Sequence, residues 1–265
     1  MAVPVTATVI TFNESANITA ALESLSWADE IVVVDSESTD DTVAIARRFT
    51  DRVIVRAWPG YVEQKNFAAA QASHDWIFSL DADERVTPAL AGELTALIAR
   101  GLPAVASAEV GPAVAGYRLP RVTFHLGRWI RSTDWYPDYQ LRLYDRRRGR
   151  WHGRYVHESV TVEGQVGVLQ QELQHYAYRD LAHHFQTMDR YTTLAAKQMF
   201  AEGRRAGWSD LVMHPPAAFV RNYLLRGGFR DGIPGLIVSA MNARYVGLKF
   251  AKLWELGRGR NGGAA

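Results

Sequence analysis

The chain has 265 residues, of which 48% are hydrophobic and 22% are charged, as in an average globular protein. This composition excludes a disordered or collagen-like chain, and the absence of cysteine excludes disulfides and thiolate metal sites. The net charge of +2 is uneven, because residues 1–100 carry 7 Lys and Arg against 15 Asp and Glu, whereas residues 101–265 carry 23 against 13. The basic second part is either a solvated surface or the place where the protein meets an anionic partner.

Strand and helix patterns alternate through the first hundred residues. The sequence predicts strands at 5–12, 30–36, 52–58 and 76–84, and helices at 16–26, 39–49, 61–72 and 87–100. The run at 30–36 is continuously apolar, which is typical of a strand buried on both faces. Such alternation predicts an α/β fold, with a mainly parallel sheet and helices on both of its faces.

The pattern changes after a connection of small residues at 101–115. Longer strands, which predict a mixed or antiparallel extension of the sheet, are expected at 117–127, 139–145 and 155–164. A long helix follows at 182–206, and then two apolar–basic helical segments at 217–226 and 233–256. We therefore expect one large domain over residues 1–207 and a helical extension over 208–265.

Two carboxylates, Asp81 and Asp83, end the apolar strand 76–84 with one residue between them. At a strand end both can point at one hard cation such as Mg²⁺, which prefers oxygen ligands and substrate phosphates. The alternative is an Asp-rich turn without a ligand. His175 is a candidate third metal ligand, although a lone histidine is more often structural.

Other polar residues also follow the predicted strands. Asn13 and Glu14 come after the first strand and Asp35 ends the second, so all three are expected at the ligand-binding edge of the sheet. A carboxylate such as Asp35 can accept hydrogen bonds from a base or a ribose. Helix capping explains Asn13 equally well.

Two basic residues are candidates for binding a diphosphate. Lys65, followed by Asn66, lies on the helix before the Asp81 strand, and Arg142 shares one face of strand 139–145 with Gln140. Because the chain has no P-loop and no G-x-G-x-x-G after the first strand, a kinase or a dehydrogenase is disfavoured.

A general base is expected from the second half of the chain. Glu158 follows a strand-like, aromatic-rich segment that includes Trp151, and Asp138 flanks a Trp-Tyr-Pro loop as the second candidate. A surface glutamate, or one paired with a nearby arginine, is the other interpretation of Glu158.

These motifs, in this order, resemble a known family. TFNE (11–14), DSxSTDxT (35–42), DADE (81–84) and WHGRYVHESV (151–160) are similar to motifs of the inverting family-2 glycosyltransferases of the GT-A fold. Within that family the chain resembles the bacterial lipopolysaccharide-core β-1,4-glucosyltransferase group. The resemblance covers roughly residues 5–200 and is much less specific for the sugar than for the family.

The resemblance implies a nucleotide-binding half at 1–110, an acceptor half at 111–207, and a metal-dependent transfer of a hexose, glucose first, from a UDP-sugar to a lipid-linked glycan. It implies Mg²⁺ or Mn²⁺ as cofactor and no nucleic-acid partner. The implied roles are a nucleotide pocket at Thr11, Asn13, Glu14, Asp35, Lys65 and Asn66, a metal–diphosphate site at Asp81, Asp83 and His175, and a catalytic carboxylate at Glu158.

Two other classes of protein remain open from the sequence. One is a nucleotidyltransferase, which would normally carry a Gly-rich loop after the first strand, and the other is a non-catalytic module that binds sugar nucleotides or membranes. No signal peptide and no transmembrane helix are expected. The basic amphipathic tail instead predicts peripheral attachment to an anionic membrane on its cytoplasmic face, with packing on the catalytic domain as the alternative.

Overall fold

The computed structural model describes residues 3–102, 114–153 and 158–259, and its contacts divide the chain into two compact units. Unit 1 comprises Met1–Arg121 and Tyr139–His175, whereas unit 2 comprises Val122–Asp138 and Tyr176–Ala265. This division differs from the boundary predicted at residue 207. The difference arises because a β-hairpin and a long helix of the predicted first domain join the C-terminal helices in unit 2.

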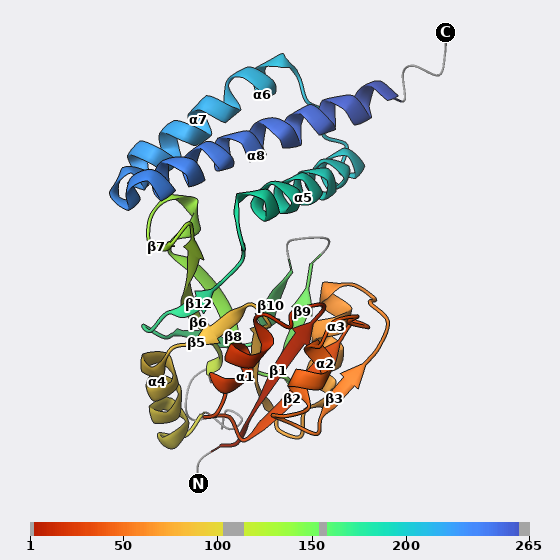
Figure 1. Cartoon of the computed structure of the whole chain (residues 1–265), viewed down its shortest axis with the longest axis vertical. Coiled ribbons are helices and arrows are strands. Elements are labelled where there is room, and N and C mark those ends of the chain that lie inside the picture. The colour runs from red at the N-terminus through yellow and green to blue at the C-terminus, as the bar shows by residue number, and fades with distance from the viewer. Residues whose placement is uncertain (1–2, 103–113, 154–157, 260–265) are drawn as a thin grey trace. The chain divides into compact units, whose positions relative to one another are not determined.

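Unit 1 is built on a mixed sheet with the strand order β3-β2-β1-β4-β8-β6-β12-β5 (Figure 1). Its first elements are β1 (Val5–Thr11), α1 (Ile18–Glu23), β2 (Glu30–Asp35), α2 (Thr42–Ala46), β3 (Val53–Val55), α3 (Tyr61–Gln71), β4 (Trp76–Asp81), β5 (Glu84–Val86) and α4 (Pro88–Ala99). β1 pairs in parallel with β2 and with β4, and β2 pairs in parallel with β3. The predicted parallel sheet is therefore confirmed in this half.

The later strands extend this sheet in mixed directions. They are β6 (Val114–His125), β8 (Asp138–Asp145), β9 (Gly149–His152), β10 (Ser159–Val162), β11 (Gln165–Val168) and β12 (Leu173–His175). β8 runs antiparallel to β4, and β12 runs antiparallel to β5. β9 and β10 form a separate antiparallel ribbon. Residues 155–157, the first three of the strand predicted at 155–164, lie outside the described residues.

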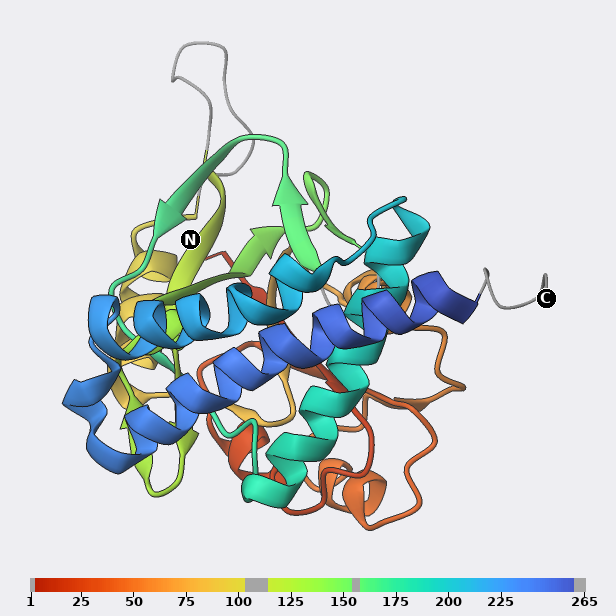
Figure 2. The same ribbon diagram turned by 90° about the horizontal axis from the view of Figure 1, so that it is seen from above.

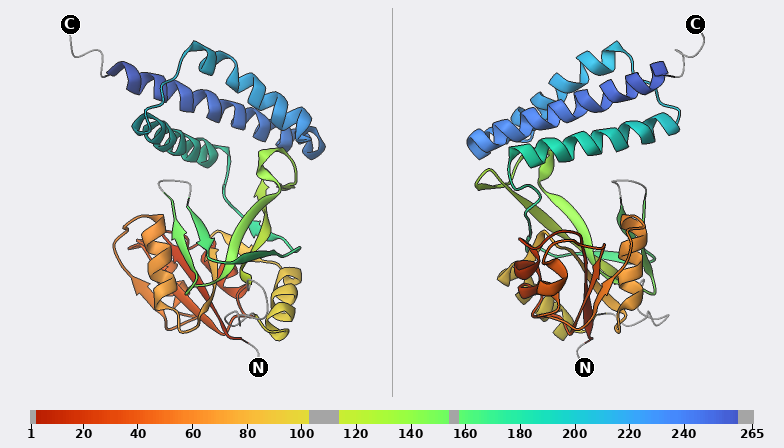
Figure 3. Two further views of the ribbon diagram at one scale, coloured as in Figure 1. Left: turned by 180° about the vertical axis from the view of Figure 1, so that it is seen from behind. Right: turned by 45° about the vertical axis from the view of Figure 1, so that its right-hand side comes forward.

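Helices cover both faces of the sheet, as predicted (Figures 1 and 3). On one face the inward side chains of β1 and β4 pack against α1 and α4. On the other face the remaining side chains of β2 and β4 pack against α3. β2 and β4 are thus buried on both faces over most of their length, as the continuous apolar run of 30–36 predicted.

Unit 2 combines a hairpin segment with a helical layer. Its elements are β7 (Arg128–Ile130), η1 (Thr133–Trp135), α5 (Leu181–Ala201), α6 (Trp208–Val212), α7 (His214–Val220), η2 (Arg221–Leu225), η3 (Gly228–Asp231) and α8 (Gly232–Gly259). Within this unit α8 lies between α5 and α7 (Figures 2 and 3). Ala196 of α5 packs against Phe250 and Leu253 of α8. No helix in the described ranges is long and apolar enough to cross a membrane.

Candidate active site

The carboxyl ends of β1, β2 and β4 meet at one edge of the sheet. Thr11 lies opposite Asp35 in the β1–β2 ladder, and Ile10 lies opposite Asp81 in the β1–β4 ladder. In open α/β sheets ligands bind beyond this edge. The strand-end residues that the sequence singled out are therefore neighbours.

Asp81 lies between two buried cations. Lys65 Nζ of α3 is 2.9 Å from its Oδ1, and Arg142 Nη2 of β8 is 2.9 Å from its Oδ2. The side chains of Lys65 and Arg142 are only 4% and 2% exposed. Burial alone would raise the pKa of Asp81, but the two cations outweigh it and hold this pKa far below the ordinary value. Asp81 is therefore ionised and joins both cations at the strand end.

Glu84 is a fully buried carboxylate that the sequence reasoning did not single out. Its Oε1 is 2.5 Å from Arg142 Nη2 and 2.9 Å from Arg121 Nη1, and its Oε2 accepts a hydrogen bond from the Asp81 backbone N–H at 3.0 Å. Burial lowers the pKa of Arg142, but Glu84 and Asp81 outweigh that effect and raise it. Glu84 therefore fixes both the charge and the direction of Arg142.

Trp151 of β9 contacts both cations beside Asp81. Lys65 Nζ lies 4.2 Å from the centroid of the indole ring, and the Arg142 guanidinium carbon lies 6.0 Å from it. Asn66 anchors this tryptophan, because its side-chain amide donates to the Trp151 carbonyl and accepts from the Trp151 N–H, each at 3.0 Å. The Asn66 amide is thus engaged by the main chain of β9, and the nucleotide contact expected of it stays a prediction.

Glu158 lies beside Lys65, at the edge of the cluster formed by Lys65, Asp81, Arg142 and Trp151. Its Oε1 is 3.9 Å from Lys65 Nζ, and its side chain is 19% exposed. Its Oε2 has no hydrogen-bond partner among the described residues. Because this Oε2 is itself buried, the structure does not show a proton acceptor open to an incoming hydroxyl, and the catalytic role of Glu158 stays a prediction.

Asp83 faces His175 across the β5–β12 pair. His175 lies opposite Glu84 in this ladder, which places the His175 Nε2 atom 3.3 Å from Asp83 Oδ2. Burial would raise the pKa of Asp83, whereas His175 and other neighbours lower it more. Both side chains keep some exposure, 27% for Asp83 and 16% for His175, so a ligand can reach them.

The donor set at this position fits a divalent cation. One carboxylate and one imidazole, completed by phosphate oxygens, suit Mn²⁺ or Mg²⁺. No group of three His, Cys, Asp or Glu side chains in the described part of the chain is arranged to hold a metal by itself. Asp81, which was also expected to be a ligand, pairs with a cation through each of its oxygens, and its metal-binding role stays a prediction. Asp83 and His175 lie side by side, and their metal-binding roles also stay predictions.

The residues after β1 and β2 hold one another. Asn13, with a φ of 53°, accepts a hydrogen bond from the Thr39 N–H at 2.8 Å, and the Asp35 carboxylate accepts one from the Ser38 N–H at 2.8 Å. The Glu14 N–H donates to the Thr42 hydroxyl at 2.8 Å. These contacts shape the loop beside the sheet edge. The nucleotide contacts expected of Asn13, Glu14, Asp35 and Thr11 stay predictions.

Asp138, the second candidate for the base, is the first residue of β8 and belongs to unit 2. Its catalytic role also stays a prediction. The residues that the sequence reasoning missed are Glu84 and Arg121, together with the contact of Trp151 with the cations. Glu84 was visible only as the last letter of the DADE motif, and nothing in the sequence pairs it with Arg121.

The chain is similar to known glycosyltransferases over most of its length. The sequence model of glycosyl transferase family 2 matches residues 6–160. The lipopolysaccharide core biosynthesis glycosyltransferase LpsC of Rhizobium meliloti (strain 1021) is 34% identical over 259 residues, which cover 95% of this chain and 92% of LpsC. An uncharacterized glycosyltransferase of Rickettsia felis is 29% identical over 263 residues, which cover 95% of this chain and 89% of the relative.

A solved structure supports the same fold. The mannosyltransferase PcManGT from Pyrobaculum calidifontis, in complex with GDP-Man and Mn²⁺, superposes with a TM-score of 0.52 at 16% sequence identity. The match covers 95% of this chain and 87% of PcManGT. The predicted GT-A architecture with C-terminal helices is thereby confirmed.

Proposed function

The chain belongs to glycosyl transferase family 2, and we propose that it moves a hexose, glucose first among candidates, from a UDP-sugar to a hydroxyl of a lipopolysaccharide-core or other lipid-linked glycan. The chain is thus a glycosyltransferase, and not the nucleotidyltransferase or binding module that its sequence left open. The observation that carries the proposal is the convergence of Lys65, Arg142 and Glu158 around Asp81, beside the Asp83–His175 pair.

The reaction we propose is one in-line displacement at the anomeric carbon, which inverts its configuration. The bond from the sugar to the diphosphate breaks as the bond to the acceptor oxygen forms. Lys65 and Arg142, which Asp81 and Trp151 hold in place, supply positive charge toward the leaving diphosphate. Glu158 takes the proton of the acceptor hydroxyl, and Asp138 is the alternative base.

Asp83 and His175 would hold Mg²⁺ or Mn²⁺. A divalent cation there would supply a Lewis acid for the charge that develops on the diphosphate. PcManGT, which shares the fold, was solved with Mn²⁺ and a nucleotide sugar. Thr11, Asn13, Glu14 and Asp35 would then contact the nucleoside at the ends of β1 and β2.

The proposed acceptor indicates where in the cell the enzyme would act. A lipid-linked glycan is presented at a membrane, and the name of LpsC places that relative in lipopolysaccharide core synthesis. We therefore place the enzyme at the cytoplasmic face of the cell membrane, attached peripherally. The excess of basic residues in the second part of the chain supports this location.

The test is release of UDP from UDP-glucose with Mn²⁺, with and without a chelator, in wild type and in two matched variants. We expect Glu158→Gln to lower kcat by about 100-fold or more while donor affinity changes little, because only the basicity is lost. Asp138→Asn should keep near wild-type rates. Normal transfer by Glu158→Gln together with an inactive Asp138→Asn would assign the base to Asp138.

A further inference from the structure

Large apolar side chains are exposed on one part of unit 2. Ten of the eighteen exposed large hydrophobic residues of the described chain lie between residues 208 and 254, in less than a fifth of the sequence. They include three of its most exposed side chains, Leu225 at 78%, Trp208 at 75% and Ile233 at 73%. Exposed apolar surface concentrated in this way marks an interaction site more often than a free surface.

α8 carries two different apolar faces. Its inner face includes Met241, Phe250 and Leu253, which are buried. Its outer face consists of residues spaced three or four apart, Ile233, Leu236, Ala240, Arg244, Gly247, Ala251 and Trp254. The tail was predicted to be basic and amphipathic, with attachment to an anionic membrane or packing on the catalytic domain as the two interpretations. In the structure the inner set packs within unit 2, whereas most of the outer set is exposed.

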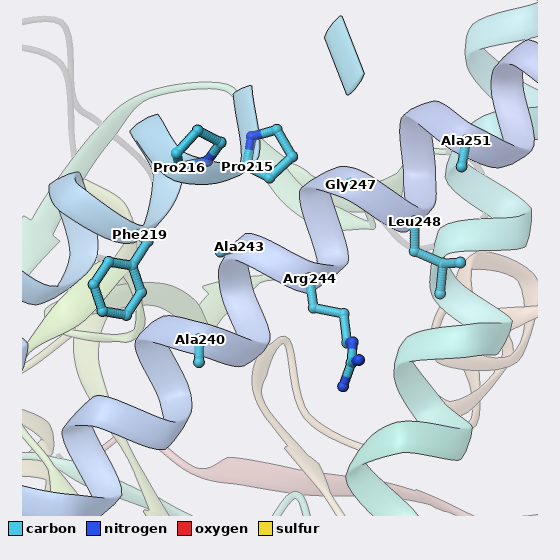
Figure 4. Close-up of a pocket in the computed structure, with 9 residues that line it drawn as sticks. All are labelled: Pro215, Pro216, Phe219, Ala240, Ala243, Arg244, Gly247, Leu248 and Ala251. Carbon is cyan, nitrogen blue, oxygen red and sulfur yellow. The ribbon is translucent and has the colours of Figure 1, made fainter. Parts of the chain in front are cut away.

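A groove joins this outer face to α7 (Figure 4). Its volume is about 580 Å³, and Pro215, Pro216 and Phe219 of α7 form one wall. Ala240, Ala243, Gly247 and Ala251 form the opposite wall on α8, and Arg244 is the charged residue of the lining. The small side chains of α8 leave an apolar trough with a cation at its edge.

The charge of this region is strongly positive. Residues 204–259 contain nine Lys and Arg against three Asp and Glu. Two of the three acids are engaged, since Asp231 is buried against Arg128 and Asp210 lies 3.4 Å from His214. Arg230 and Arg244 are exposed, and each lies beside a phenylalanine ring. The face therefore combines aromatic and aliphatic side chains with arginines.

We propose that the outer face of α7, η2, η3 and α8 docks on an anionic lipid surface, with the groove between α7 and α8 taking acyl-chain carbon and the arginines taking lipid headgroups. Helices with this combination lie in the headgroup plane of a bilayer. A second copy of the chain fits the face less well, because a two-fold contact would bring its arginines against their own counterparts. The docking surface rests on the proposed function in one respect: a lipid-borne acceptor would be the reason for the enzyme to bind a membrane.

The experiment is flotation of the full chain with phosphatidylcholine vesicles, with and without phosphatidylglycerol. We expect binding only to the anionic vesicles, and a loss with rising salt. Leu225→Glu with Ile233→Glu should lower the bound fraction at least about tenfold, because two exposed apolar contacts become charged. The matched control is Phe49→Glu with Val168→Glu, two exposed apolar residues of unit 1, which should bind like wild type.

A second pair of variants tests the charge. Arg230→Glu with Arg244→Glu should weaken binding to anionic vesicles, whereas Arg47→Glu with Arg48→Glu, which changes the charge equally on α2, should not. Release of UDP from UDP-glucose in detergent-free solution, measured on the same variants, should stay at the wild-type rate. Absence of UDP release by the wild-type protein would overturn the proposed function but would not contradict the docking surface.

Two outcomes overturn the docking surface. One is vesicle binding by Leu225→Glu with Ile233→Glu that equals wild type. The other is a wild-type dimer in light scattering that these substitutions convert to a monomer without a change in vesicle binding, since the face would then cover a second copy.

Discussion

Trp151 places one aromatic ring against the two cations that hold Asp81. We expect Trp151→Leu to raise the KM for the donor about tenfold, because a desolvated cation–π contact contributes on the order of 1–2 kcal/mol. kcat should fall much less, since Asp81 still binds both cations. Trp151→Phe keeps a ring and should recover most of the affinity. Steady-state kinetics with varied UDP-glucose measure both constants.

The control for this prediction is Trp58→Leu. Trp58 is 45% exposed and makes an edge contact with Tyr61 at the start of α3. Equal effects of Trp58→Leu and Trp151→Leu on KM would mean that the ring of Trp151 only fills space. A failure of Trp151→Phe to restore affinity would point the same way.

A substitution at Glu84 measures how much its buried ion pairs with Arg142 and Arg121 contribute to stability. Glu84→Gln leaves Arg142 and Arg121 without a carboxylate that both now contact. We expect the free energy of unfolding to fall by about 3–5 kcal/mol, the usual effect of removing one partner of a buried ion pair. Glu63→Gln, which removes a 65% exposed carboxylate beside Arg56, should cost less than about 1 kcal/mol. Urea denaturation of both variants gives the comparison, and similar losses would refute it.

Residues of this kind mark the limit of sequence reasoning. Asp81 and Asp83 could be found because a strand pattern ends at them, and strand ends of a parallel sheet are ligand positions. The contacts of Glu84 and Trp151 could not, because Arg121 and Arg142 pair with Glu84 from β6 and β8, and Lys65 meets the Trp151 ring from α3. The pairing of β8 with β4 and the amide of Asn66 bring these groups together, and neither can be read from the sequence.

The lengths of the helices were also predicted only in part. The helices predicted at 16–26 and 39–49 are only Ile18–Glu23 and Thr42–Ala46. Polar side chains at 35–42 explain the second difference, since Asp35 and Asp40 bind neighbouring backbone N–H groups and hold a turn. The helix predicted at 87–100 is Pro88–Ala99, close to the prediction, and Thr87 caps it because its hydroxyl accepts the Leu90 N–H at 3.1 Å. Local capping was predictable, whereas competition between turn and helix was not.

A contact between His125 of β6 and His184 of α5 makes the free energy of unfolding depend on pH. His184 Nδ1 lies 3.1 Å from His125 Nε2, and burial, followed by His125 and His183, lowers the pKa of His184 from 6.5 to about 4. The unfolded chain therefore binds a proton more readily than the folded protein does between these values. The contribution of His184 to stability is complete above about pH 6.5 and is lost as pH falls toward 4.

We expect His184→Phe to flatten the dependence of the free energy of unfolding on pH in this window. Phenylalanine keeps the stacking against Tyr178, whose ring lies 4.1 Å from His184, and it cannot take up a proton. His214→Phe, at a side chain that is 51% exposed, should leave the slope unchanged. Urea titrations at a series of pH values measure the slopes, and an unaltered slope in His184→Phe would contradict the assignment.

For the whole molecule, the order of helices and strands along the chain does not show which of them pack together into one unit. α5 was assigned to the first domain by position, yet its apolar side packs on α8 and its Asp189 accepts hydrogen bonds from Lys252 at 2.6 and 2.7 Å. The segment 122–138 likewise belongs to unit 2. Amphipathic periodicity shows that a helix has a buried side, but it does not say which other element covers that side.

This division predicts that residues 1–207 do not fold as a separate protein. Removal of 208–265 takes away the partners of Asp134, which binds Arg221 and the buried Asn222, and of Ser132, whose hydroxyl donates to Asp231 at 2.6 Å. It also uncovers the apolar side of α5. We expect the shortened chain to bind a hydrophobic dye strongly and to lose a cooperative thermal transition in unit 2.

A chain shortened only to residue 259 keeps all of α8 and serves as the control, with a transition close to that of the full chain. Calorimetry and dye fluorescence compare the three proteins. A cooperative, dye-free 1–207 would show that α5 and the 122–138 segment fold without the C-terminal helices. The boundary predicted from the sequence would then be the better description, because the buried contacts of Asn222 and Asp231 would add little to the stability of unit 2.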